Sequence, residues 1–431
     1  MKTTMSANEL LKLKGFYKNE LINQILAFWM PRCEDKEYGG FVNCFDNEGK
    51  KLMGYDKYTW SQGRFVWMFA KLAATEVPMF SQKERGEFLR LAKSGRDFLM
   101  KHCLMDTDDM RCVFLMERDG RHKYVGDYKT LDMSIYADCF AVLGMAGYAA
   151  ATGDEETYLW AKRLYDSIVA RVRSGKFHTL PYPLSENYRA HGIPMILSNV
   201  TKELIDASRK IAPTDCDELK ELLDGFTSDI LDHFVDENNT VHEIIHSDNT
   251  WVEGLIGQHA NPGHTIEDMW FMIDAADILD KPEMVTKAAK IAARAFEIGW
   301  DDEMGGVLHY ADVHGGVPKD LTLSTDEPME RQVLEGYGDK LWWVHSEALY
   351  TTLLCHFRTG DKAFLDWHEK VFDYTFKTFP NTDPEIREWK QICKRDGSPQ
   401  DKVVALPVKD PFHITRNLLL ILELLEKVSF S

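Results

Sequence analysis

The sequence predicts an all-α fold, an (α/α)6 barrel of six helical hairpins with short β-strand loops at one end. One observation behind this prediction is a short strand-like run, closed by a turn, that recurs along the chain. Nearly every interval between two such runs contains two segments with the apolar periodicity of a helix. The runs occupy residues 37–49, 110–120, 240–246, 305–312 and 388–397, with a weaker candidate at 176–178.

Two helices and a strand loop, repeated in this way, are typical of a closed ring in which helices alternate between an inner and an outer layer. An open superhelix of helix pairs would give a similar pattern. The inner-type helices carry too many aromatic and charged residues for a flat binding face, which favours the closed ring. Because nothing resembling a linker divides the chain, we expect residues 1–431 to form a single (α/α)6-barrel catalytic domain.

The composition supports a large core with an aromatic-lined cavity. Of the 431 residues 44% are hydrophobic, and they include 11 Trp, 16 Tyr and 23 Phe. The net charge of −18 argues against nucleic acid and anionic membranes as partners. We expect a cytoplasmic protein, because the N-terminus lacks an apolar signal region and no stretch approaches about 18 uncharged apolar residues. The eight cysteines contain no Cys-x-x-Cys pair, which predicts reduced thiols.

The first predicted elements are an amphipathic helix over residues 8–31 and then an inner-type helix with a mixed aromatic and cationic face. Trp60, Arg64 and Trp67 share that face at the spacing i, i+4, i+7. In a sugar cleft, the indoles would stack on the pyranose and the guanidinium would hold hydroxyl or carbonyl oxygens. The alternative is a structural arginine stacked between two tryptophans.

Another inner-type helix is predicted at residues 339–348, where Lys340, Trp343 and Glu347 fall on one stripe. A tryptophan pair such as this one is more often core than a platform for a ligand. The flanking lysine and glutamate would not be accepted unpaired in a dry core, and they favour a wet functional cleft.

Residues 261–267, Asn-Pro-Gly-His-Thr-Ile-Glu, are where we place the chemistry. Asn261 is a good N-cap and Pro262 suits the first helical position, so that His264 lies near the third. The positive end of the helix dipole disfavours imidazolium there, and we expect a neutral ring that can take up a proton at pH 7. Glu267 lies one turn further along the same face.

Residues 410–413, Asp-Pro-Phe-His, open a second helix in the same way and put His413 near its third position. Arg416 stands three residues further on, so the two histidines would have opposite charged neighbours. Two histidines that face one cavity would suit removal of a proton on one side and delivery on the other. The alternative is that each histidine only helps to cap its helix.

The sequence His-Glu-Ile-Ile-His at residues 242–246 matches a zinc-binding pattern, but that chemistry requires a helix. Turn-forming residues flank the motif on both sides, and it occupies one of the recurring strand positions. Four residues of a strand span about 13 Å, so His242 and His246 would not share one ion. We therefore predict no metal site.

Together these motifs resemble the N-acylglucosamine 2-epimerase family. The resemblance covers nearly the whole chain, and its motifs are long and occur in order. They are residues 38–41, 57–68, 261–267, 299–301, 340–348 and 412–416.

The resemblance implies an (α/α)6 barrel and interconversion of N-acetyl-D-glucosamine with N-acetyl-D-mannosamine at C2. It also implies that His264 and His413 are the acid/base pair, with Arg64 and Glu347 in the pocket. A mechanism of this kind opens the pyranose, removes the C2 proton with one histidine and reprotonates the planar enediolate with the other.

Negative charge grows on O1 during such a reaction, and a cation must stabilise it. Arg64 is the first candidate and Lys340 the second, and each such contact is worth roughly 3 kcal/mol. Glu347 or Glu267 would assist ring opening or orient an imidazole, and the sequence does not separate these roles. The other candidates for substrate binding are Trp60, Trp67, Trp343 and Arg416.

One position bears on the substrate class. The related cellobiose 2-epimerases and mannose isomerases share a sequence pattern that has a histidine directly after the methionine corresponding to Met195. This chain has Ile196 there, which is closer to the N-acyl type. His191 lies five positions earlier, and we do not treat it as a substitute.

Several points stay open at this stage. Some members of the family need ATP as an effector rather than a reactant, and the absence of a Walker-type loop decides nothing about that role. We also expect a homodimer.

The alternative functions are an isomerase or 2-epimerase of unsubstituted sugars such as mannose and cellobiose, an inverting glycoside hydrolase with Glu267 and Glu347 as its carboxylates, and a non-catalytic carbohydrate-binding toroid.

Overall fold

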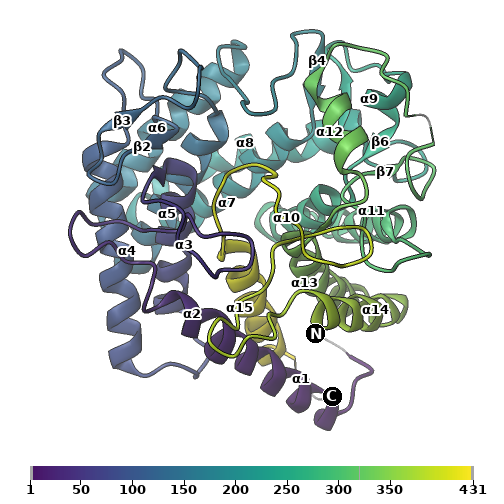
Figure 1. The fold of residues 1–431 in the computed structure, drawn as a ribbon, viewed down its shortest axis with the longest axis horizontal. Coiled ribbons are helices and arrows are strands. Elements are labelled where there is room, and N and C mark those ends of the chain that lie inside the picture. Colours follow the sequence, from purple (N-terminus) through teal and green to yellow (C-terminus); the bar gives the residue numbers. More distant parts are fainter. Residues whose placement is uncertain (1–2, 320, 429–431) are drawn as a thin grey trace.

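Helices dominate the computed structural model, which describes residues 3–319 and 321–428 (Figure 1). Within these residues, six helices form an inner layer. They are α3 (Thr59–Ala74), α5 (Ile135–Thr152), α7 (Gly192–Ile211), α10 (Pro262–Leu279), α13 (Trp342–Thr359) and α15 (Phe412–Glu426).

Each inner helix packs against the next one, and α15 returns to α3, so the inner ring is closed. Among the outer helices, every inner helix packs most extensively against a single one. The outer helices are α1 (Ala7–Asn19), α4 (Gln82–His102), α6 (Glu155–Arg173), α8 (Cys216–Asp229), α11 (Pro282–Gly299) and α14 (Ala363–Thr378). The predicted (α/α)6 barrel is confirmed, and the open superhelix is not what the chain forms.

Shorter helical segments complete the layers. The predicted helix over residues 8–31 is observed as α1, a π-helical stretch and a last turn, which ends at Trp29. The short segments are α2 (Ala27–Trp29), α9 (Gly254–Gln258), α12 (Pro328–Gly336), the π-helical stretches Glu20–Leu26 and Ile230–Phe234, and the 3-10 turn Pro213–Asp215.

Helix α5 shows why inner helices are apolar on all sides. It is long and apolar enough to cross a membrane by composition, with a mean hydropathy of 1.3 over 18 residues. The expectation that no stretch approaches this composition was wrong for α5. However, 78% of its residues are buried within the fold. A helix that is surrounded by α3, α6 and α7 needs apolar residues all round, as a membrane span does.

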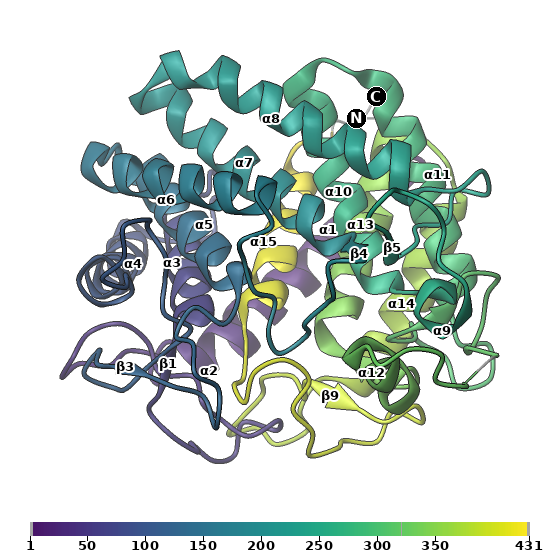
Figure 2. The ribbon, with the colours of Figure 1, turned by 90° about the horizontal axis from the view of Figure 1, so that it is seen from above.

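Short antiparallel strands lie in the loops that precede the inner helices. Figure 2 shows β1, β3 and β9 along the lower edge of the view, with β9 next to α12. In β4 and β5, Tyr188 lies opposite His246. The sheets are β1 (Lys57–Tyr58) with β2 (Leu115–Met116) and β3 (His122–Lys123), β4 (Tyr188–Ala190) with β5 (Ile244–His246), β6 (His259–Ala260) with β7 (Ala311–Asp312), and β8 (Lys340–Leu341) with β9 (Ile392–Cys393).

Four of the predicted strand-like runs contain one of these strands, namely β2, β5, β7 and β9. The run at 37–49 forms only isolated bridges, at Phe41 and Phe45. The weak candidate at 176–178 was misplaced, because the strand in this part of the chain is β4, several residues later.

The two predicted helix starts differ in detail. Asn261 caps α10 by accepting a hydrogen bond from the His264 amide, and His264 is the third residue of that helix, as predicted. Helix α15 instead begins at Phe412, so His413 is its second residue. The Asp410 carboxylate accepts a hydrogen bond from the Phe412 amide.

A close contact between α3 and α5 fixes the position of the cavity-lining side chains on both helices. A Cβ atom on Gly63 would lie 2.0 Å from the carbonyl oxygen of Phe140, and one on Gly144 would lie 2.4 Å from the carbonyl oxygen of Gly63. Only glycine permits this approach. It brings the Trp60 ring into a stacked contact with Phe140, with 5.0 Å between the ring centroids.

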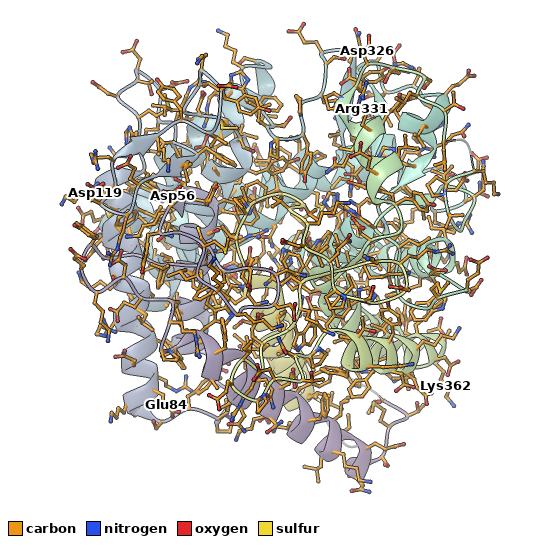
Figure 3. All side chains as sticks on the ribbon, in the orientation of Figure 1. Asp56, Glu84, Asp119, Asp326, Arg331 and Lys362 are labelled. Carbon is orange, nitrogen blue, oxygen red and sulfur yellow. The ribbon has the colours of Figure 1, made fainter. Side chains whose placement is uncertain are left out.

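Charged side chains gather at the periphery. Figure 3 shows Glu84, Asp119 and Lys362 pointing outward from the ribbon. Charges at the surface keep their hydration, so the net charge of −18 does not disturb the core. Charged side chains inside the barrel need hydrogen-bond or ion-pair partners, and these pairs lie around the candidate site.

Candidate active site

A cavity of about 1710 Å³ opens at the N-terminal ends of the inner helices. These ends meet because an outer helix reverses the chain between consecutive inner helices. The cavity is lined by Trp60 and Arg64 of α3, Tyr136 and Phe140 of α5, Met195, Ile196 and Asn199 of α7, His264, Glu267 and Phe271 of α10, Trp342 and Trp343 of α13, and His413 and Arg416 of α15, together with the loops above them.

The two predicted histidines face this cavity and share one aromatic neighbour. The Trp343 ring centroid lies 5.7 Å from that of His264 and 5.4 Å from that of His413. The side chain of His264 is 35% exposed and that of His413 is 7% exposed. The indole therefore offers an apolar surface between two imidazoles, in a cavity large enough for a sugar.

His413 is held by a buried carboxylate. Its Nδ1 lies 2.7 Å from Oε1 of Glu347, which is fully buried and does not line the cavity. The second oxygen of Glu347 accepts a hydrogen bond from the Trp270 indole at 2.8 Å. Burial raises the pKa of Glu347, but the charge of Arg416 and the bond to His413 outweigh it and bring that pKa to about 2. Glu347 thus orients the imidazole and does not reach a substrate.

His264 is held in the same way by a residue that the sequence analysis passed over. Its Nδ1 lies 2.8 Å from Oε1 of Glu243, which is 4% exposed. Burial lowers the pKa of His264, but the charge of Glu243 and the hydrogen bond to it outweigh burial and raise that pKa. The predicted neutral ring, argued from the helix dipole, is therefore wrong in its direction, because a full charge in contact exceeds the partial charge of a helix end.

Arg64 lies beside the other nitrogen of His413. Its Nη2 is 3.2 Å from His413 Nε2, and its Nη1 pairs with Asp410. The guanidinium also lies over the Phe140 ring, at 4.1 Å from the centroid. Arg64 is thus held by a carboxylate and an aromatic ring, with its Nη2 directed at the imidazole of His413.

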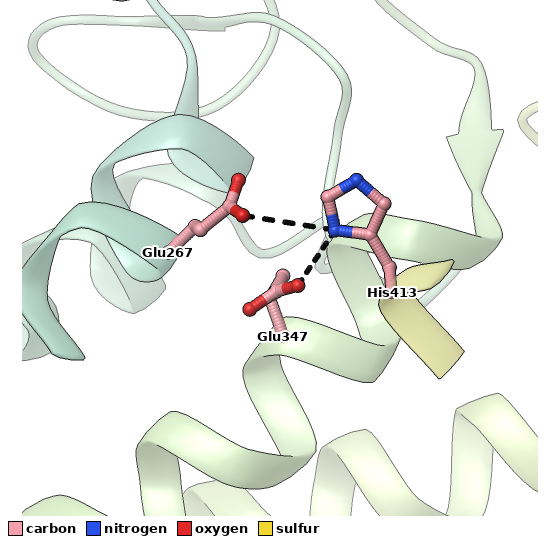
Figure 4. A group of neighbouring side chains, drawn as sticks. All are labelled: Glu267, Glu347 and His413. Atoms are coloured by element: carbon pink, nitrogen blue, oxygen red, sulfur yellow. Dashed lines mark hydrogen bonds and ion pairs between the residues drawn. The ribbon is translucent and has the colours of Figure 1, made fainter. Parts of the chain in front are cut away.

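Figure 4 shows the carboxylates of Glu267 and Glu347 both directed at His413 Nδ1, and the distances are 3.7 Å and 2.7 Å. Arg416 Nη2 donates to both carboxylates. The three groups that Figure 4 draws are spaced closely enough to hold a metal ion. The guanidinium already donates to both carboxylates, and its positive charge opposes a metal ion there.

This arrangement corrects the predicted pairing of charges. Glu267 and Arg416 were expected to be the opposite charged neighbours of two different histidines. They pair with each other across the barrel, and each histidine has its own carboxylate. The reason is tertiary, because α10 and α15 bring these side chains together over a long sequence separation.

Two of the predicted substrate-binding residues do not line the cavity. Trp67 is 4% exposed, its indole donates to Glu203 at 2.9 Å, and its ring packs against Phe412. Lys340 is fully buried and its ammonium pairs with Asp301 at 3.0 Å. Both predictions were wrong, because other elements cover these side chains. Trp60, Trp343 and Arg416 do line the cavity.

The zinc-like motif is extended, as predicted, because its last three residues form β5. Its two histidines have different neighbours. His242 packs on Trp251 with 4.3 Å between the centroids, and His246 stacks on Tyr188. The functional signal in this motif is Glu243. In an extended chain it points to the opposite face from His242, toward the barrel, and only that alternation could have indicated its role.

The carboxylate geometry argues against the glycoside hydrolase alternative. The nearest oxygens of Glu267 and Glu347 lie within 4.8 Å of each other and share one guanidinium nitrogen. Inverting hydrolases separate their carboxylates by roughly 6.5–9.5 Å to admit a water molecule. Glu347 is also fully buried behind His413.

Comparison with known proteins agrees with this geometry. The family model described as N-acylglucosamine 2-epimerase (GlcNAc 2-epimerase) matches residues 39–416. An N-acylglucosamine 2-epimerase of Bos taurus is 31% identical over 417 residues, with 94% of this chain and 90% of the relative covered. That of Mus musculus is 30% identical over 407 residues, with 92% and 88% covered.

Among solved structures, the cellobiose 2-epimerase from Bacillus thermoamylovorans superimposes with a TM-score of 0.75. The two chains are 20% identical, and the match covers 97% of this chain and 100% of that one. At this identity the likeness supports the barrel fold alone.

Proposed function

The chain belongs to the N-acylglucosamine 2-epimerase family, and from this premise we propose that it interconverts an N-acylglucosamine and the corresponding N-acylmannosamine at C2. The observation that carries the proposal is a pair of imidazoles in one cavity, each with a buried carboxylate at its Nδ1. A carboxylate at Nδ1 leaves Nε2 of each ring as the nitrogen that exchanges a proton.

The steps follow from this geometry. Ring opening yields the aldehyde, which acidifies the C2 proton. Nε2 of one histidine takes that proton, and the electron pair of the C2–H bond moves into the enediolate, which leaves negative charge on O1. Nε2 of the other histidine, which carries a proton, delivers it to the opposite face of C2. Solvent then resets the two protonation states.

Arg64 is the cation placed to stabilise O1. It is held by Asp410 next to His413 Nε2, so an oxygen that displaces this contact would lie beside both groups. A preorganised donor of this kind is typically worth roughly 3 kcal/mol in the transition state. Lys340, the second candidate, is buried against Asp301 and takes no part in this proposal.

The reaction moves only protons, so its chemistry needs no cofactor. ATP has no chemical role in these steps, and any requirement for it would be that of an effector. The indole of Trp343, between the two imidazoles, is the surface on which we expect the open-chain sugar to lie.

A 2-epimerase or isomerase of unsubstituted sugars is the second candidate, because such enzymes share the barrel. The side chain of Ile196, which lines the cavity, favours the N-acyl class as argued from the sequence. We expect kcat/KM for N-acetylmannosamine to exceed that for mannose at least about tenfold, an increment of about 1.4 kcal/mol. Equal efficiencies, or fructose as the main product from mannose, would assign the chain to the second candidate.

Exchange in D2O tests the two-base mechanism directly. His264→Asn and His413→Asn should each lower net epimerisation at least about a hundredfold, the usual contribution of a general base. Each variant keeps one histidine and should still exchange the C2 proton of one epimer with solvent. The two variants should therefore exchange different epimers, and exchange of the same epimer by both would refute the opposite-face assignment.

A further inference from the structure

Behind His264 lies a chain of buried ionisable groups that runs away from the cavity. Oε1 of Glu243 contacts His264, and its Oε2 lies 3.5 Å from Nδ1 of His191. Nε2 of His191 lies 2.9 Å from Oδ2 of Asp268. His191, the residue before α7, and Asp268, in α10, are both fully buried. Among the described residues, neither Glu243 Oε2 nor His191 Nδ1 has a hydrogen-bond partner.

The charges of this chain alternate. Burial lowers the pKa of His191, but the hydrogen bond to Asp268 and the nearby charge of Glu243 outweigh it and raise that pKa to about 10. His191 is therefore a cation at neutral pH, between two carboxylates. Burial raises the pKa of Glu243, but the charges of His264 and His191 outweigh it and lower that pKa. A buried carboxylate stays ionised only when such a partner is present.

We propose that His191 and Asp268 are positioning residues that hold Glu243 as an anion beneath Nδ1 of His264. This proposal rests on the proposed function, since it assigns the chain to the half of the reaction that His264 carries. The anionic carboxylate accepts a hydrogen bond from the Nδ1–H group of His264, so Nε2 faces C2 with a free electron pair. When Nε2 takes the C2 proton, the imidazolium remains paired with Glu243.

The two halves of the site are built with different cations. The carboxylate behind His413 is neutralised by Arg416, whose charge is permanent. The carboxylate behind His264 is neutralised by His191, which has no contact with His413 among the hydrogen bonds and ion pairs of the described residues. The two halves can therefore be perturbed separately.

The other titratable groups near this chain are neutral or already paired. Burial lowers the pKa of His259, and it lowers that of His309 to about 3. Burial also raises the pKa of the phenols Tyr136 and Tyr310, so both keep their protons at neutral pH. Glu267 faces His264 from the next turn of α10 and is paired with Arg416. The charge next to His264 is thus set by Glu243.

The test uses Glu243→Gln, His191→Asn and Asp268→Asn, with C2 exchange in D2O measured separately for each epimer. An amide at position 243 keeps the shape of the side chain and can still accept a hydrogen bond from Nδ1–H, but it removes the negative charge. We expect Glu243→Gln and His191→Asn to slow, at least about tenfold, the exchange of the same epimer that His264→Asn abolishes. Exchange of the epimer that depends on His413 should stay within about twofold.

A pH profile separates this role from a merely structural one. Loss of the negative charge destabilises the imidazolium of His264, so the acidic limb of kcat/KM for that epimer should move to lower pH in Glu243→Gln. His368→Gln is the matched control, because His368 is also a buried histidine, bonded to Tyr17 and Thr352, and does not line the cavity. It should leave the position of that limb unchanged.

Asp268→Asn keeps the proposal testable if His191→Asn fails to fold. Removal of one of the two anions next to His191 should produce the same one-sided loss of exchange, in smaller degree. Equal slowing of both epimers, or an unmoved acidic limb in Glu243→Gln, would overturn the proposal while wild-type epimerisation still stood. A wild-type protein that interconverts no amino sugar would instead overturn the proposed function.

Discussion

Arg416→Met tests whether one guanidinium offsets the electrostatic repulsion between two buried carboxylates. Arg416 is 2% exposed and donates from Nη2 to both Glu267 and Glu347, whose nearest oxygens lie within 4.8 Å. Without the cation, two charges at this distance repel by about 3 kcal/mol at an effective dielectric constant of about 20. Breaking a buried pair by removal of one partner typically costs about 3–5 kcal/mol, which agrees with that estimate.

We expect the variant to lose about 3–5 kcal/mol of unfolding free energy at pH 8, and less at pH 5. The sign follows from proton binding, because the repelling carboxylates bind a proton more tightly in the folded variant than in its unfolded chain. Stability is therefore lost above the raised pKa and recovered as the pH falls below it. Guanidinium chloride unfolding at both pH values measures the difference.

The double variant Glu267→Gln/Arg416→Met is the compensating control. It removes one negative charge together with the positive one, so it should recover most of the lost stability at pH 8 while Glu347 still holds His413 at Nδ1. The same deficit at pH 5 and pH 8, or no recovery in the double variant, would refute the charge-balance argument. Glu267→Gln alone leaves Arg416 paired with Glu347 and should cost less than Arg416→Met.

Two further predictions concern the scaffold. Gly63→Ala should lower the melting temperature and kcat/KM together, because its Cβ would meet the Phe140 carbonyl oxygen at 2.0 Å and separate α3 from α5. The control is Gly86→Ala, whose Cβ would have nothing within 4 Å and which should leave both quantities unimpaired. An unaffected Gly63→Ala variant would contradict the close packing of α3 and α5. For Asp301, burial raises the pKa, but its cationic partners, Arg395 first, bring it to about 2. Its contribution to stability is present above about pH 3.8 and lost as the pH falls through 2, so Asp301→Asn should flatten the pH dependence of unfolding between these values, and an unchanged slope would refute this.

The sequence alone determined the architecture. The recurring strand-like runs and the helical periodicity between them specify alternating layers. A helix that is buried on all sides has apolar residues all round, whereas a helix that faces water has them on one face only. Local capping chemistry also placed His264 correctly, since Asn261 and Pro262 act on the residues next to them. Interactions within one turn can be read from spacing.

Only the tertiary structure decided which side chains meet. Spacing put Trp67 on one face with Trp60 and Arg64, but it could not show that Phe412 and Glu203 cover Trp67 lower in the barrel. Spacing likewise left the partners of Lys340 undetermined.

The charges that surround the catalytic candidates were likewise decided only by the tertiary structure. The carboxylate that raises the pKa of His264 comes from Glu243, in a strand loop between α8 and α10. The cation that neutralises Glu267 comes from Arg416, near the other end of the chain. A charge acts through distance in space, and the closure of the inner ring sets that distance.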